Sequence, residues 1–182
     1  ELNPVVASRF AGAFVAGLPA GPIVLSRDGR TSGRMLAAAV QSAVMAVGHE
    51  VIDAGIAATP TTGVLVRETG AAGGIQVSAS HNPPQYNGLK LFSSEGCVIS
   101  AAAGGQVLER YRSDQIPWGD SETVAGITVV EDTLAEHARL VLETVDGRVQ
   151  LTVQDEGSGI PEGEMHKLFT DFGKTSVKPT GN

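Results

Sequence analysis

The 182-residue sequence is poor in cysteine and positive charge and has no long apolar run. These shortages argue against disulfides, membrane spans and general binding to polyanions. Cys97 is the only cysteine, so an internal disulfide is impossible and a reducing compartment, the cytoplasm, is expected. No uncharged apolar run is long enough to predict a membrane span. The net charge of −7 argues against general binding to nucleic acid or anionic membranes, so a bound anion needs local Arg, Lys or backbone amides.

Aromatic residues make up only 4% of the chain, which predicts a core built from Ala, Val, Leu and Ile. Short apolar runs alternate with helical patterns, and such alternation is typical of a mainly parallel sheet with right-handed crossovers. Strands are expected at 23–25, 51–56, 73–79 and 89–92, the last antiparallel, and helices are expected to start at Pro4, after Ser32, at Thr59 and at Ala101. The fold class predicted is α/β, with three α/β/α layers and a mixed, mainly parallel four-stranded sheet.

The stretch from Val77 to Lys90 lies between two of the expected strands and cannot itself be strand or helix. Pro83 and Pro84 lack amide donors and push their predecessors out of the helical region. Ser80 is therefore expected at the carboxyl end of a strand, on an ordered and exposed loop. A hydroxyl held there can act as a nucleophile, although Ser, Asn and Pro are also common in plain turns.

A second polar loop, from Ser26 to Gly33, follows the first expected strand and leads into a helix, with Ser32 as the expected cap. Arg27 and Arg30 lie in this loop, ahead of a helix amino terminus, which is a suitable place for an anion. A solvated turn with incidental charge is the alternative interpretation of this loop taken alone.

Together the two loops resemble the α-D-phosphohexomutases. Ser80-His81-Asn82-Pro83-Pro84, followed by Tyr86-Asn87-Gly88-x-Lys90, resembles the phosphoserine loop of that family, and Arg27-Asp28-x-Arg30-x-Ser32-Gly33 resembles a second motif at the family's spacing. The resemblance covers about residues 1–146. It implies a domain I over 1–113 and, over 114–146, a connection and terminal helix of the same family.

The resemblance also implies a site. Ser80 would carry a phosphoryl group, Lys90 would handle the sugar hydroxyl proton, and His81 is the second candidate for that role. Arg27, Arg30 and Asn82 are the candidate residues for substrate or phosphate binding. Mg²⁺ is the implied cofactor, bound through the phosphate on Ser80, and a hexose phosphate or hexose bisphosphate is the implied partner.

The pattern changes near Gly147, and residues 147–182 resemble part of the ATP-binding domain of sensor histidine kinases. An alternating strand at 148–154 leads into Asp155-x-Gly157-x-Gly159-Ile160, and a short helix follows, so a β-α appendage is expected. Asp155, Gly157 and Gly159 are the candidate nucleotide-binding residues. Because the other glycine and metal-binding parts of a kinase site are absent from the sequence, weak nucleotide binding at best is expected.

The function expected is that of a phosphoserine-bearing phosphohexomutase domain, incomplete and inactive alone. The Asp-x-Asp-x-Asp metal loop and the sugar- and phosphate-gripping loops that the resemblance implies do not occur in the 182 residues. A binding module for phosphosugars without turnover, an inert scaffold and a fragment of a kinase-like ATP-binding protein remain alternatives. The sequence leaves open which hexose is bound, the oligomeric state, and whether the two patterns were joined naturally.

Overall fold

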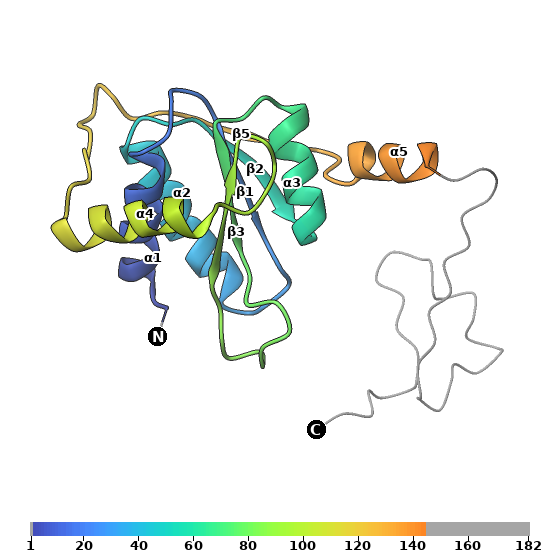
Figure 1. Ribbon diagram of the computed structural model, residues 1–182, viewed down its shortest axis with the longest axis horizontal. Coiled ribbons are helices and arrows are strands. Elements are labelled where there is room, and N and C mark those ends of the chain that lie inside the picture. Colours follow the sequence, from blue (N-terminus) through green and yellow to red (C-terminus); the bar gives the residue numbers. More distant parts are fainter. Residues whose placement is uncertain (1, 145–182) are drawn as a thin grey trace. The chain divides into compact units, whose positions relative to one another are not determined.

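The computed structural model of the chain describes residues 2–144 (Figure 1). The helices are α1 (Pro4–Val15), α2 (Gly33–Ala46), α3 (Thr59–Glu68), α4 (Ala101–Ser113) and α5 (Ala135–Glu143), and the strands are β1 (Ile23–Arg27), β2 (Val51–Ile56), β3 (Gly73–Val77), β4 (Leu89–Ser93) and β5 (Ile127–Val129). None of the helices within 2–144 has the length and apolar character needed to cross a membrane. The β-α appendage and the kinase-like segment predicted at 147–182 lie outside the described residues.

The sheet is mixed and mainly parallel, with the order β4-β3-β1-β2-β5. β1 pairs in parallel with both β2 and β3, β5 pairs in parallel with β2, and β4 runs antiparallel to β3. The α/β class, the parallel core and the antiparallel strand are therefore confirmed.

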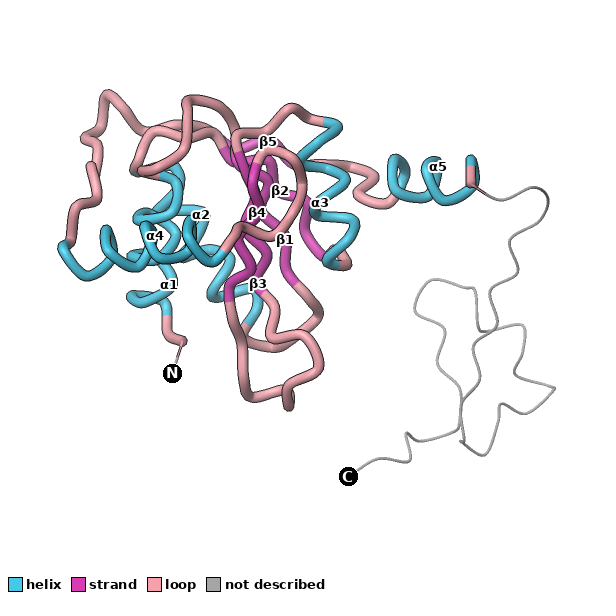
Figure 2. The backbone as a smooth tube through the Cα atoms, in the orientation of Figure 1, coloured by secondary structure: helices cyan, strands magenta, loops and turns pink. Residues whose placement is uncertain are grey.

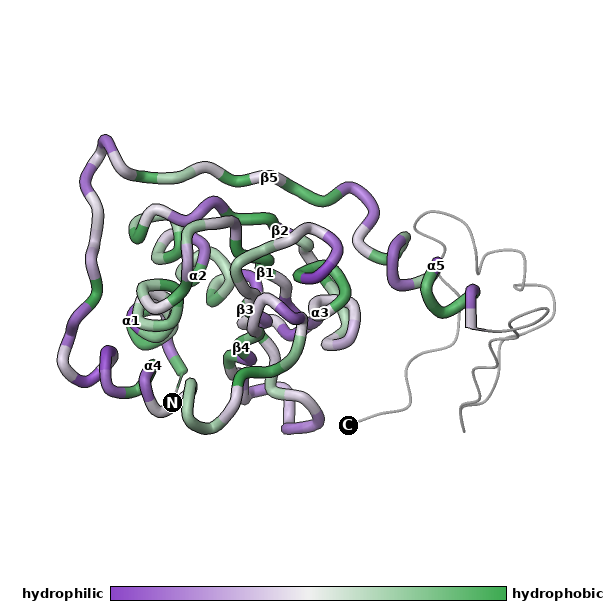
Figure 3. Tube along the Cα trace, turned by 45° about the horizontal axis from the view of Figure 1, so that its top comes forward, coloured by the Kyte–Doolittle hydropathy of each residue, from purple (hydrophilic) through white to green (hydrophobic). Residues whose placement is uncertain are grey.

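The sequence predicted four strands, but the sheet has five. The additional strand is β5, in which Ile127–Val129 lies at the edge beside Val51–Asp53 of β2. All three residues of β5 are exposed, and Figure 3 shows that this exposed stretch is nevertheless largely hydrophobic. A run of three residues without a buried face gives no alternating pattern, so its pairing could not be read from the sequence.

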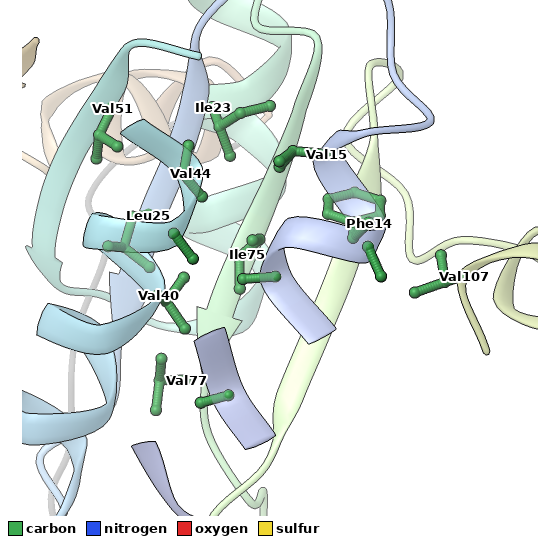
Figure 4. Close-up of a cluster of buried hydrophobic side chains, with 14 of the residues drawn as sticks. Phe14, Val15, Ile23, Leu25, Val40, Val44, Val51, Ile75, Val77 and Val107 are labelled. Carbon is green, nitrogen blue, oxygen red and sulfur yellow. The ribbon is translucent and has the colours of Figure 1, made fainter. Parts of the chain in front are cut away.

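Helices cover both faces of the sheet (Figure 2). On one face, α1, α2 and α4 share an apolar cluster with the strands, which includes Phe14, Leu36, Ile75 and Val107. On the other face, α3 packs on a smaller cluster around Val24 and Phe92, and α5 contacts α3. The buried side chains point toward one another in Figure 4 and are almost all aliphatic, as predicted.

The first polar loop begins later than predicted, because Ser26 and Arg27 belong to β1. The buried Ser26 hydroxyl shares a hydrogen bond of 2.7 Å with the Thr62 hydroxyl of α3. This partner allows a polar residue to continue a strand that is covered on both faces. Arg27 pairs with Val77 in the parallel ladder and ends the strand.

The starts of α1 and α2 differ in how they are capped. The Asn3 side chain accepts the amide of Val6 at 3.0 Å and caps α1, which begins at Pro4 as predicted. Ser32 precedes α2, but its side chain makes no capping bond. Its hydroxyl instead accepts the amide group of Asn87 at 3.1 Å, so it joins α2 to the loop between β3 and β4.

Two glycines allow α3 to lie directly on the turn that follows β4. A Cβ atom built on Gly63 of α3 would collide with the carbonyl oxygen of Gly96, and a Cβ atom on Gly96 would collide with that of Gly63. Gly96 also has a φ of 73°, a left-handed conformation that glycine adopts without a steric penalty. The two backbones are therefore in contact without any side chain between them.

Candidate active site

Two polar loops meet at the carboxyl ends of the central strands β1 and β3. Residues 28–32 follow β1, and residues 78–88, referred to below as the serine loop, connect β3 to β4 (Figure 2). The amide of Asp28 donates to the carbonyl of Val77 at 3.0 Å, and the amide of Ala57 donates to the carbonyl of Arg27 at 3.0 Å. The ends of β1, β2 and β3 are thus tied together at the edge where open α/β sheets bind ligands.

Ser80 is exposed on the serine loop, as predicted. Its φ of 58° places it in the left-handed region, which is uncommon for a residue other than glycine. Its amide donates to the Ser78 hydroxyl at 3.2 Å, and its carbonyl accepts an N–H of Arg30 at 3.0 Å. The backbone of Ser80 is therefore held at both its amide and its carbonyl.

A cleft of about 370 Å³ opens beside Ser80. It is lined by Asp28, Ala57, Ala58, Thr59, Gln76, Ser78, Ser80, His81 and Lys90. The structure thus brings the three candidate catalytic residues, Ser80, His81 and Lys90, to a single cleft. The amino end of α3 forms one wall of it.

Lys90 is held by a chain of polar groups that ends inside the protein. Its Nζ donates to the Thr59 hydroxyl at 2.9 Å, and that hydroxyl donates to Oε1 of Gln76 at 2.7 Å. Nε2 of Gln76, a residue only 1% exposed, donates to the carbonyl of Ala57 at 2.9 Å. Because Nε2 of Gln76 is bonded to Ala57, the orientation of the Gln76 amide is fixed and Oε1 faces Thr59. The Thr59 hydroxyl has one proton, which it donates to Oε1, so it can only accept a hydrogen bond from Lys90.

Arg30 lies on the loop after β1, and its side chain is only 12% exposed. Its Nε donates to the Asp28 carboxylate at 3.0 Å. Its two terminal nitrogens donate to four backbone carbonyls of the serine loop, those of Ser80, Asn82, Pro83 and Tyr86, at 2.6–3.2 Å. The guanidinium therefore joins the two polar loops.

Asp28 is the charged partner of Arg30. Burial acts to raise the pKa of its carboxyl group, but the backbone amide of Arg30, the Ser78 hydroxyl and the Arg30 guanidinium together hold that pKa below its usual range. The Asp28 carboxylate is connected to Ser80 through Arg30, which donates to both residues.

Arg27 and Asn82 are not among the residues that line the cleft. Nη1 of Arg27 donates to the carbonyl of Asp28 at 3.2 Å. The side-chain amide of Asn82 donates to the carbonyl of Ala79 at 2.8 Å, within the serine loop. Their predicted roles in phosphate binding stay predictions.

Sequence reasoning did not select Asp28, Ser78, Thr59 or Gln76 as site residues. Asp28 has a recognisable local signal, since an Asp two residues before an Arg can accept its amide in an Asx turn, as it does here at 3.1 Å. Thr59 precedes a proline at a predicted helix start. Gln76 gives no signal beyond being a polar residue in a buried strand.

Residues 2–144 contain no group of three His, Cys, Asp or Glu side chains that could hold a metal ion. Mg²⁺ requires near-octahedral oxygen coordination that usually includes one or two carboxylates. Ser80 offers one hydroxyl oxygen, and the carboxylate in its cleft, Asp28, is engaged by Arg30 and Ser78. The described residues alone do not fit a Mg²⁺ site, so binding through a phosphate on Ser80 stays a prediction.

Comparison with known proteins identifies a family match and several relatives of the chain. Residues 1–116 match the family described as phosphoglucomutase/phosphomannomutase, alpha/beta/alpha domain I. The chain is 34% identical over 155 residues to a phosphoglucosamine mutase of Lactobacillus acidophilus, a match that covers 83% of this chain and 34% of the relative. It is 38% identical over 128 residues to a phosphoglucosamine mutase of Parasynechococcus marenigrum, covering 70% of this chain and 28% of the relative.

Solved structures agree with the sequence relatives. A phosphoglucomutase/phosphomannomutase family protein from Burkholderia thailandensis superimposes with a TM-score of 0.66 at 25% identity, covering 78% of this chain and 32% of that one. The chain thus spans about a third of the length of the relatives it matches. The candidate nucleotide-binding residues Asp155, Gly157 and Gly159 lie outside both the family match and the described residues.

Proposed function

Because the chain belongs to the phosphoglucomutase/phosphomannomutase family through its α/β/α domain I, we propose that Ser80 carries the phosphoryl group in a hexose phosphate mutase. The observation that supports this best is the exposure of Ser80 in a cleft that it shares with Lys90 and His81. A nucleophile and a proton-transfer group within one cleft are what phosphoryl transfer to a sugar hydroxyl requires.

In the proposed reaction, phosphorylated Ser80 donates its phosphoryl group to a free hydroxyl of a hexose monophosphate. The bond between phosphorus and the sugar oxygen forms as the bond to Oγ of Ser80 breaks. Lys90, as the neutral amine, takes the proton of the sugar hydroxyl, and the released Oγ takes up a proton from solvent to become a hydroxyl again. The resulting hexose bisphosphate returns its other phosphoryl group to Ser80, and a proton goes back to the sugar oxygen that is released. His81, exposed in the same cleft, is the second candidate for the proton transfer.

Thr59 has a supporting role in this proposal. Since its hydroxyl can only accept from Lys90, it fixes one Nζ–H and leaves the others to face the cleft. The family uses Mg²⁺, which neutralises charge on a transferring phosphoryl group. The described residues alone do not fit a site for this ion.

We further propose that the 182-residue chain does not complete the mutase reaction alone. The chain has no Asp-x-Asp-x-Asp sequence, the metal loop that the family resemblance implies. Incubation with glucose 1-phosphate and Mg²⁺ should give no hexose 6-phosphate in a coupled assay, and a measurable rate would refute this part of the proposal. Binding of phosphosugars without turnover is the remaining function of this site.

Mass spectrometry and NMR together test the role of Ser80. After incubation with glucose 1,6-bisphosphate and Mg²⁺, the peptide that contains Ser80 should gain one phosphate, and the Ser80→Ala chain should not. Glucose 6-phosphate or glucosamine 6-phosphate should shift the amide signals of the serine loop and of Lys90. The proposal fails if Ser80 gains no phosphate and neither sugar phosphate shifts these signals.

A further inference from the structure

The guanidinium of Arg30 has no N–H left for a ligand. A guanidinium carries five N–H donors, and Arg30 makes five hydrogen bonds to acceptors on the two loops. One acceptor is the Asp28 carboxylate and the other four are backbone carbonyls of residues 80, 82, 83 and 86. A phosphate could reach Arg30 only by displacing one of these carbonyls.

We infer that Arg30 is a positioning residue that shapes the serine loop before any ligand arrives, rather than a residue that binds phosphate. The four carbonyls belong to a segment of seven residues, 80–86, that includes two prolines and no regular secondary structure. Such a segment has few backbone partners of its own, so its carbonyls need donors from elsewhere. The planar fork of Arg30 supplies them from a single point.

The same side chain fixes the conformation of Ser80. The carbonyl of Ser80 accepts from Arg30, and its amide donates to the Ser78 hydroxyl. Both peptide groups of Ser80 are therefore held by side chains, one of them that of Arg30. A residue at φ 58° persists when its surroundings specify it in this way.

Lysine cannot replace arginine in this role. An ammonium group has three donors on one nitrogen, whereas the loop presents four carbonyls around a planar group. The inference concerns the shape of the loop, so it holds whether or not Ser80 carries a phosphoryl group. A test on the chain without ligand therefore separates it from the proposed function.

Hydrogen exchange of the complete chain tests the inference directly. The amides of Asn82 and Tyr86 donate to carbonyls within the loop, those of Ala79 and Pro83, and their exchange reports whether the loop is formed. In Arg30→Lys these two amides should exchange at least about tenfold faster than in the unaltered chain, because several charge-assisted hydrogen bonds are lost. Arg34→Lys, an equivalent change at an exposed position of α2, should leave them unchanged, and the amides of β3 should be unaffected in both. Equal exchange of Asn82 and Tyr86 in the Arg30→Lys and unaltered chains would overturn the inference.

A second measurement needs no variant. In ¹⁵N-arginine-labelled chain, the guanidinium signals of Arg30 should show slow rotation and slow solvent exchange, and they should keep both properties when inorganic phosphate is added. Loss of those properties on adding phosphate, with a shift of the Arg30 signals, would show that Arg30 leaves the loop to bind the anion and would overturn the inference. If Ser80 gains no phosphate and neither sugar phosphate shifts the signals of the serine loop, while both results for Arg30 appear as expected, the proposed function fails and the role of Arg30 stands.

Discussion

Replacing Thr59 with valine tests the polar chain that holds Lys90. Valine keeps the shape and β-branching of threonine but can neither donate to Gln76 nor accept from Lys90. Gln76 is 1% exposed, so Oε1 would lose its partner in a place that water reaches poorly. An unsatisfied buried polar atom costs about 1–3 kcal/mol. At a urea slope of about 2 kcal/mol per molar, a loss of about 2 kcal/mol lowers the unfolding midpoint by about 1 M.

Urea unfolding followed by circular dichroism measures this effect, with Thr59→Ser as the matched control. Serine keeps the hydroxyl, so its midpoint should lie close to that of the unaltered chain. Lys90 is the single lysine among residues 2–144, so its ammonium signal can be assigned with a Lys90→Arg chain and should become more mobile in Thr59→Val. Equal midpoints for the valine variant and the unaltered chain, or a serine variant as unstable as the valine one, would refute the reasoning.

Three further predictions concern the loops and helix packing. Ser80→Val should lower the free energy of unfolding by about 1 kcal/mol or more, because a β-branched residue is strained at φ 58°. Ser80→Gly should lower it by less. Urea unfolding of the two variants measures both free energies. The pKa of Asp28 is held below its usual range, so its contribution to stability is complete above its ordinary value of 3.8 and is lost as the pH falls through the lower folded value. The difference in urea midpoint between the unaltered chain and Asp28→Asn should therefore shrink on acidification, and a constant difference would contradict the assigned ion pair. Gly63→Ala should destabilise the chain by about 1–3 kcal/mol, because the added methyl group collides with Gly96. Gly105→Ala, which adds a methyl group in open space on α4, should stabilise the chain by about 0.5–1 kcal/mol through the higher helix propensity of alanine. Thermal unfolding of the two variants separates the packing effect from the propensity effect.

Much of the fold could be predicted from the sequence because its long elements have clear patterns. β1 and β3 are wholly or almost wholly buried, and their short apolar runs are bounded by turn residues. β5 escaped prediction because its pairing with β2 is a long-range contact and its three residues have no buried face. Ser32 was predicted as a helix cap for the same reason, because its actual partner is distant in sequence. Its hydroxyl accepts a hydrogen bond from Asn87, a residue 55 positions away.

The candidate site divides in the same way. Ser80, His81 and Lys90 could be selected because one continuous stretch of sequence, residues 80–90, contains all three. The residues that hold Lys90 could not be selected, because Thr59, its partner, lies on α3, and Gln76, the partner of Thr59, lies on β3. The arginines were assigned from their charge, their place ahead of a helix and the motif that contains them. None of these tells whether the donors of Arg30 are already occupied.

The contact between Gly63 and Gly96 has a mechanical consequence for the site. Gly63 lies in the helix that begins with Thr59, and Gly96 lies in the turn that ends the strand carrying Lys90. Backbones that touch without intervening side chains have little freedom to slide, so the helix and the strand should move as one body. The separation of the Thr59 hydroxyl and the Lys90 amine should then stay constant whenever either element shifts, because neither can move without the other.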